Sequence, residues 1–246
     1  MKEEKKMINT KSRISRILLI KTIPLIFIAG VYAQNTNNYG LKIIADYGEY
    51  QKVIQQDSTK RLLEIKKHIP SISLDIKYAT GNNFLHEAVY SQAVAFARKP
   101  VIEALVNVQN ELNRQGLGLK IYDAYRPYSV TVYFYEKVKD TTFVAAPWHG
   151  SRHNRGCAVD LTIINMKNGK EIKMPTKFDD FTDKARPDYA KLPGKRIRNR
   201  DLLIKTMEKY GFQVYEAEWW HFDLLGWENY ELMDIPFKNL KNTNPE

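Results

Sequence analysis

The stretch SRHNRGCAVDLTIINMKNGK, residues 151–170, carries the clearest strand and turn signals of the chain. Five of the seven residues 158–164 are apolar, and strand alternation places Asp160 on the face opposite to the residues that enter the core. Asn168-Gly169 is the dipeptide that most favours a tight hairpin turn. We therefore expect residues 158–164 to form a strand that pairs antiparallel with residues 171–174.

Strand and helix signals alternate on both sides of this stretch. Before it, the pattern predicts a strand over residues 71–78, a helix from Pro100 to Gly116, a strand over 117–124 and a helix over about 130–138. After it, a helix over about 198–210 ends at Gly211, and two short strands follow over 212–215 and 219–224. These elements predict an α+β fold, a small antiparallel or mixed sheet with helices packed against it.

The chain divides into three predicted parts. Residues 1–33 have the pattern of a signal peptide, residues 34–60 form an N-terminal leader, and residues 61–240 form one domain. A short helix is expected over residues 61–68, where the leader meets the domain. We find no internal repeat and no composition change that would split the large domain in two.

The first 33 residues have the order of a secretory signal. Six Lys and Arg side chains lie between residues 2 and 16, and an apolar run follows over residues 23–31. A membrane anchor is the alternative, but Lys21 and Pro24 shorten the run to about ten residues, and about twenty are needed to span a bilayer. We expect cleavage after Ala33, a periplasmic or secreted protein, and no stable membrane span after processing.

Charge and cysteine content exclude other classes. The formal net charge is +10, and residues 1–33 hold seven basic and two acidic side chains, so their removal leaves +5. A charge of that size does not require a nucleic-acid partner. Cys157 is the only cysteine, so no internal disulfide can form, and no cysteine follows the apolar run to accept a lipid anchor. Nothing in the sequence fixes the oligomeric state.

His153, Asp160 and His221 supply the residue types of a catalytic zinc site. Such a site uses three nitrogen or carboxylate ligands and keeps a fourth position open for water. Gly156 lets the chain turn after His153, and Asp160 follows on a rigid strand. The spacing therefore predicts one zinc ion on these three side chains.

Glu218 and Arg126 complete the predicted chemistry. Residues 218 and 221 differ by three, so on a regular strand their side chains would face opposite ways. Glu218 must therefore lie before the strand or on a bulge, from which its carboxylate can act as base toward the zinc-bound water. Arg126, at the end of a predicted strand, is a candidate to stabilise the negative carbonyl oxygen of the transition state.

Each of these assignments has an alternative. His149 lies four residues before His153, but the Pro and Gly around it favour a loop rather than a helical zinc pair. Cys157 can in principle ligate zinc, yet alternation places it on the face opposite to Asp160. Arg126 can instead cap a turn or pair with Asp123.

At these positions the sequence resembles the D-alanyl-D-alanine dipeptidases, the VanX type within the wider zinc D-Ala-D-Ala peptidases. The resemblance extends from about residue 63 to residue 227, and it departs from the family pattern at Cys157 and Pro175. The segments that carry it are Lys77-Tyr78-Ala79-Thr80-Gly81-Asn82-Asn83-Phe84, Ala124-Tyr125-Arg126-Pro127, Ser151 to Asp160 followed by Leu161-Thr162, Phe178-Asp179, and Glu218-Trp219-Trp220-His221.

The resemblance implies the same zinc ligands, Glu218 as base and Arg126 as transition-state stabiliser. It also implies that Ser151 contacts the substrate and that Tyr78 and Asp179 hold the free ammonium of a dipeptide. A negative residue in a small closed pocket suits an exopeptidase that accepts only free dipeptides.

The sequence thus predicts a zinc metallopeptidase that hydrolyses D-Ala-D-Ala in cell-wall peptide turnover. An exported enzyme cannot reach the cytoplasmic dipeptide pool, so turnover outside the inner membrane fits better than antibiotic resistance. Two alternatives remain at this point. One is a D,D-carboxypeptidase or endopeptidase that acts on intact peptidoglycan, and the other is a non-catalytic zinc-binding module.

Overall fold

The computed structural model describes residues 37–142 and 144–241. The expected signal peptide, residues 1–33, and its cleavage point lie outside this part of the chain. Within the described residues, no helix is both long enough and apolar enough to cross a membrane.

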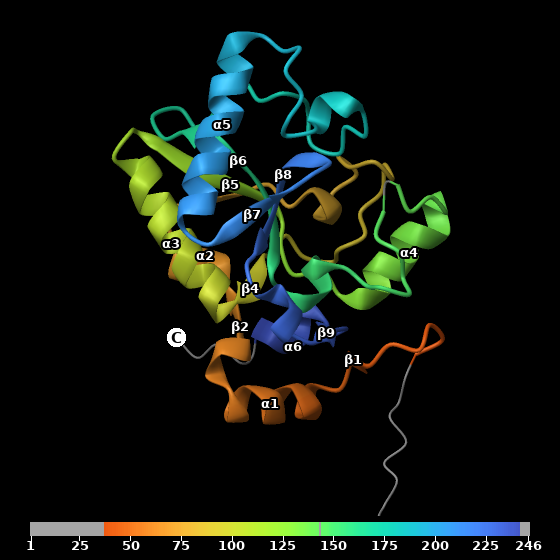
Figure 1. The fold of residues 1–246 in the computed structure, drawn as a ribbon. Coiled ribbons are helices and arrows are strands. Elements are labelled where there is room, and N and C mark those ends of the chain that lie inside the picture. The colour runs from red at the N-terminus through yellow and green to blue at the C-terminus, as the bar shows by residue number, and fades with distance from the viewer. Residues whose placement is uncertain (1–36, 143, 242–246) are drawn as a thin grey trace, which may run out of the picture. The chain divides into compact units, whose positions relative to one another are not determined.

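A five-stranded mixed sheet lies at the centre of the fold (Figure 1). Its strand order is β3-β5-β6-β8-β7, in which β3 and β5 are parallel and the other neighbours are antiparallel. This arrangement confirms the predicted α+β class with a small mixed sheet. The strands are β3 (Ser73–Leu74), β5 (Leu117–Asp123), β6 (Ala158–Asn165), β7 (Phe212–Tyr215) and β8 (Glu218–Leu224).

Three helices accompany this sheet, and all three were predicted from sequence. α3 (Lys99–Asn113) and α5 (Gly194–Lys209) pack against each other and against β5 and β7, whereas α4 (Tyr128–Val138) lies apart from them (Figure 1). α3 has a proline in its first turn and buries one apolar stripe. Gly116 follows it with a φ of 68°, a conformation that glycine adopts without strain.

The hairpin predicted after β6 is present only in part. Gly169 has a φ of 66°, so the Asn168-Gly169 turn forms as expected. The returning chain, however, makes only one isolated bridge, between Ile164 and Glu171, and no second strand. Pro175 cannot donate a ladder hydrogen bond, and the Lys173 carbonyl accepts a hydrogen bond from a side chain of α5 instead.

The segment before the sheet differs from the sequence prediction. The helix expected over residues 61–68 is confined to α2 (Ile65–His68), because β2 (Leu62–Glu64) pairs antiparallel with β4 (Phe96–Arg98). Only two residues of the strand expected over 71–78 pair in the sheet, and the chain then turns through Lys77–Ala79. Both differences come from tertiary contacts that override local pattern.

Four short elements from the two ends of the described chain complete the fold. α1 (Tyr47–Gln56) was not predicted, and it buries Tyr50 and Ile54. β1 (Ile43–Ile44) pairs parallel with β9 (Leu232–Met233), and α6 (Phe237–Lys241) follows near the C-terminus.

Candidate metal centre and active site

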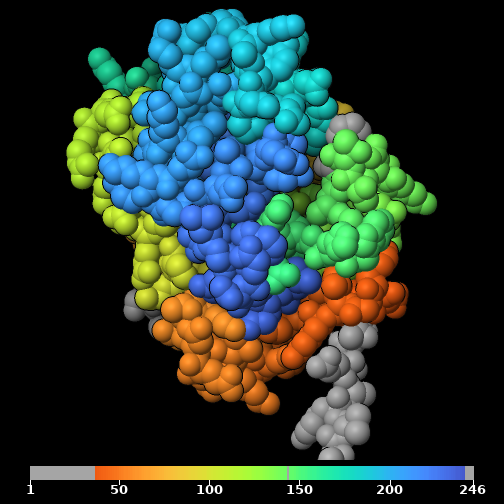
Figure 2. All heavy atoms as spheres, in the orientation of Figure 1, coloured from red at the N-terminus to blue at the C-terminus, as the bar shows by residue number. Residues whose placement is uncertain are grey.

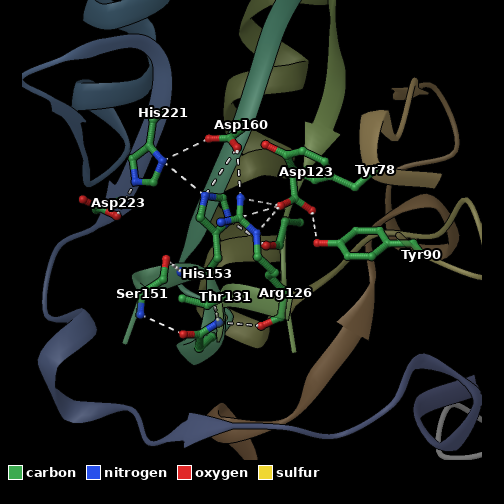
Figure 3. Close-up of polar contacts among 12 residues, drawn as sticks. Tyr78, Tyr90, Asp123, Arg126, Thr131, Ser151, His153, Asp160, His221 and Asp223 are labelled. Atoms are coloured by element: carbon green, nitrogen blue, oxygen red, sulfur yellow. Dashed lines mark hydrogen bonds and ion pairs between the residues drawn. The ribbon is translucent and has the colours of Figure 1, made fainter. Parts of the chain in front are cut away.

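Two neighbouring strands bring the predicted ligands together. Asp160 on β6 is paired directly with His221 on β8, so both side chains leave the sheet on one face (Figure 3). His153 comes from the 3-10 turn Arg152–Arg155 just before β6. Gly156 ends that turn with a φ of 70°, as the sequence predicted.

The three side chains converge as metal ligands do. His153 Nε2 lies 3.2 Å from His221 Nδ1 and 3.4 Å from an Asp160 oxygen, and His221 Nδ1 lies 3.0 Å from the other Asp160 oxygen. Zinc bonds of about 2.0–2.1 Å in tetrahedral geometry place ligand atoms about 3.3 Å apart. Among the described residues this is the one His, Cys, Asp and Glu group that could hold a metal ion, and all three members are buried.

The outer nitrogens of both rings are already engaged. His153 Nδ1 lies 2.7 Å from the Ala124 carbonyl, and His221 Nε2 lies 3.0 Å from a carboxylate oxygen of Asp223. The Ala124 carbonyl and the Asp223 carboxylate each accept a hydrogen bond from the ring N–H of the histidine that they contact. The other ring nitrogens, His153 Nε2 and His221 Nδ1, then direct their lone pairs toward each other. The buried Asp160 Oδ1 also accepts no well-formed hydrogen bond. A bound cation satisfies all three atoms, so the residues present fit a zinc ion.

Asp223 was not singled out in the sequence. It follows His221 by two residues on the same strand, so period-two alternation places both side chains on one face. That alternation was the signal available to find it. Its carboxylate orients the His221 ring in the way that outer partners of metal-binding histidines do.

Glu218 lies at the start of β8, where the pairing with β7 is irregular. Val214 pairs with Phe222, but the next residue, Tyr215, pairs with Glu218. This bulge removes Glu218 from the regular alternation, so its carboxylate lies 3.7 Å from His221 Nδ1 on the same side. Burial raises the pKa of Glu218.

Arg126 both pairs with Asp123 and faces the metal group. Its Nε and Nη2 atoms donate to one Asp123 oxygen at 2.9 and 2.8 Å, and Nη2 is 3.9 Å from Asp160. Asp123 also accepts a hydrogen bond from the Tyr90 hydroxyl at 2.9 Å. The alternative predicted for Arg126 is therefore present, and it fixes the guanidinium beside the site.

Tyr78 and Asp179 meet on another side of the metal group. The Tyr78 hydroxyl lies 3.2 Å from an Asp179 carboxylate oxygen. Asp179 has a φ of 58°, a left-handed conformation that Asp adopts more often than most residues with a side chain. Burial, together with the negative charges of Asp160 and Glu218, raises the pKa of Asp179 well above its usual value.

These residues share one cavity of about 530 Å³. In Figure 2 the surface is hollowed between the green segment that includes α4 and the blue segment of the last strands. All eight residues that the sequence predicted for the site line the cavity: Tyr78, Arg126, Ser151, His153, Asp160, Asp179, Glu218 and His221.

The alternative ligands lie outside the metal group. His149 lines the cavity but does not belong to the converging set. Cys157 is fully buried, and burial raises the pKa of its thiol to about 12. Such a thiol stays protonated at neutral pH and is a poor metal ligand.

Comparison with known proteins shows which family the chain belongs to. The model of the D-ala-D-ala dipeptidase family, peptidase family M15, matches residues 58–240. The chain belongs to this family. It is therefore a zinc metallopeptidase, a hydrolase, as the resemblance in the sequence implied.

Individual members of the family match most of the chain. The D-alanyl-D-alanine dipeptidase of Escherichia coli is 33% identical over 73% of this chain and 92% of its own length. The enzyme of the same name from Enterococcus faecalis is 28% identical over 66% of this chain and 91% of its own. Among solved structures, the LdcB LD-carboxypeptidase gives a TM-score of 0.37 at 19% identity, covering 61% of this chain and 70% of that chain.

Proposed function

We propose that this member of the family hydrolyses D-Ala-D-Ala and related D,D-dipeptides, with zinc on His153, Asp160 and His221. The observation that supports this most strongly is the set of residues that line the cavity of about 530 Å³. The converging metal group, a carboxylate suited to act as base and a carboxylate suited to bind an ammonium group all line it.

Bound zinc would supply Lewis acidity toward a water molecule and the scissile carbonyl. Glu218 then accepts a proton from the attacking water and passes it to the leaving amine. Its raised pKa suits a group that must both take up and release a proton. Arg126, held by Asp123, places a fixed positive charge where the carbonyl oxygen becomes negative.

Asp179 is the proposed recognition group for the substrate ammonium. Burial and the negative charges of Asp160 and Glu218 raise the pKa of this carboxyl, and a substrate ammonium would offset both effects. The Tyr78 hydroxyl beside it holds the carboxylate in place. A peptide with a blocked amino terminus cannot form this ion pair, which favours free dipeptides.

We also propose that the enzyme acts outside the inner membrane, in the turnover of cell-wall peptides. The signal-like pattern of residues 1–33 supports export to the periplasm or beyond. In that compartment the available D,D-peptides come from the wall rather than from the cytoplasmic precursor pool.

A second candidate is a carboxypeptidase or endopeptidase that acts on peptidoglycan with the same site. The cavity volume of about 530 Å³ favours it, since cavities of this size take drug-sized ligands and leave room beyond a dipeptide. A non-catalytic zinc module has less support, because it needs neither Glu218 nor Arg126 beside the metal.

Replacing the proposed base tests the mechanism. Glu218→Ala should bind zinc as the unchanged protein does but lose at least about a hundredfold in D-alanine release, because only proton transfer is removed. Glu216→Ala, which alters an exposed neighbouring carboxylate, is the control. If Glu218→Ala loses its zinc, this residue is a ligand rather than the base.

A further inference from the structure

We infer that Arg152 binds the terminal carboxylate of the substrate and so makes the enzyme selective for peptides with a free C-terminus. This inference rests on the proposed function. A free dipeptide carries a positive and a negative end, and Asp179 accounts only for the positive one. The cavity therefore needs a cation that is available to the carboxylate.

Three arginines line the cavity, and two of them have other partners or roles. Arg126 directs two nitrogens to Asp123. Arg155 donates from Nη1 to the Tyr230 carbonyl and packs over the Trp227 ring. Arg126 is already assigned to the carbonyl oxygen of the transition state, and a main-chain carbonyl accepts the Arg155 hydrogen bond, so neither is assigned to the substrate carboxylate.

Contacts with three residues hold the Arg152 guanidinium in place but leave its terminal nitrogens available. Its guanidinium lies over the rings of Tyr215 and Trp227, 5.5 and 5.0 Å from their centres, and its Nε is 3.5 Å from Asp223. Within residues 37–142 and 144–241, its two terminal nitrogens form no hydrogen bond. With 38% of the side chain exposed, they remain accessible. A planar guanidinium that is already stacked on aromatic rings can bind a carboxylate with two nitrogens and loses little side-chain entropy when it does so.

The position of Arg152 suits the far end of a dipeptide. In Figure 3, His221 and Asp223 lie on one side of Asp160, and Tyr78 lies on the other. Arg152 contacts Asp223, whereas Asp179 contacts Tyr78. Arg152 and Asp179 thus contact different residues around the metal group. A dipeptide with its ammonium at Asp179 and its scissile bond at the metal group directs its carboxylate toward Arg152.

Ser151 precedes Arg152 and supports the same assignment. Its hydroxyl oxygen accepts a hydrogen bond from the His153 amide at 3.2 Å, which fixes it at the start of the turn. Ser151 and Arg152 both line the cavity, and a hydroxyl and a guanidinium can both donate to one carboxylate. The resemblance assigned Ser151 to the substrate without a charged partner, and Arg152 supplies that partner.

The test compares D-Ala-D-Ala with its C-terminal amide in the zinc-loaded protein and in Arg152→Gln. The unchanged protein should prefer the acid. In Arg152→Gln the KM for the acid should rise about tenfold or more, with kcat and the amide reaction little changed, because one charge-assisted contact is lost. Arg152→Lys, which keeps the charge without the planar fork, should fall between them.

Arg155→Gln is the matched control, since it removes an equal charge from the same cavity and should keep the acid-to-amide ratio. A purely structural role of Arg152 would slow both substrates equally, and an unchanged ratio in Arg152→Gln would overturn the inference. Calorimetric binding of the acid and the amide to zinc-loaded Glu218→Ala gives a second readout without turnover. If the unchanged protein cleaves no D,D-dipeptide at all, the proposed function fails instead.

Discussion

At the scale of single residues, the catalytic chemistry depends on partners that no short motif contains. Sequence spacing identified His153, Asp160 and His221, because a zinc site needs those residue types near a turn and on strands. It could not show that the Ala124 carbonyl and Asp223 hold the outer ring nitrogens. Those contacts join segments far apart in the chain, and only the folded sheet brings them together.

Asp179 provides a prediction at this scale. Asp179→Asn keeps a residue that tolerates the positive φ but removes the charge. The kcat/KM for D-Ala-D-Ala should fall at least about thirtyfold, since a buried ion pair loses one partner. Steady-state kinetics with an amino-blocked dipeptide should show little change, and Asp180→Asn is the control. Equal losses on both substrates would favour the endopeptidase alternative.

At the scale of elements, the site depends on one turn, one strand pair and one bulge. Because residues 218 and 221 differ by three, Glu218 had to leave the regular alternation of β8 for both side chains to face the site. The irregular pairing at Tyr215 produces that change of register. The amphipathic helices and the Gly156 turn also follow from local pattern. Two features do not follow from local pattern. β2 forms because it pairs with β4. Residues 171–174 form no full strand beside β6, because a side chain of α5 bonds to the Lys173 carbonyl.

The Gly156 turn provides a prediction for this scale. A methyl group on Gly156 would lie 2.5 Å from a Leu62 methyl that is fully buried, and φ is 70°. Gly156→Ala should therefore lower the free energy of unfolding by about 2–4 kcal/mol, through backbone strain and overpacking. Urea denaturation measures this change.

Gly169→Ala is a matched control for that experiment. Gly169 has a φ of 66°, but no atom lies within 4 Å of the added methyl position. Only the backbone strain of a positive φ remains, so the free energy of unfolding should fall by about 1–2 kcal/mol. Equal losses in the two variants would show that contact with Leu62 is not important for the His153 turn.

At the scale of the whole molecule, the segment before residue 60 contributes to the packed fold. Tyr50 is fully buried, and its hydroxyl accepts a hydrogen bond from the Leu62 amide at 2.7 Å. β1 pairs with β9, and Leu232 of β9 lies close to Gly150, next to Ser151 in the cavity wall. The N-terminal segment thus supports the turn that holds the substrate residues.

Truncation tests this support. A chain that begins at residue 58 loses the burial of Ile44, Tyr50 and Ile54, each worth about 1.5–3 kcal/mol at most. Compared with a chain that begins at residue 34, its free energy of unfolding should fall by at least about 3 kcal/mol. Tyr50→Phe, which removes only the hydrogen bond to Leu62, should cost about 1–3 kcal/mol. Identical urea midpoints for both chain lengths would refute this role.

The most direct measurement compares D-alanine release from D-Ala-D-Ala and from N-acetyl-D-Ala-D-Ala by zinc-loaded protein that begins at residue 34. We predict rapid release from the free dipeptide and at least about a hundredfold slower release from the acetylated form, because Asp179 then lacks its ammonium partner. Chelation of the metal should abolish the reaction. No release from D-Ala-D-Ala, or equal rates on the two substrates, would contradict a zinc dipeptidase that recognises the free amino terminus.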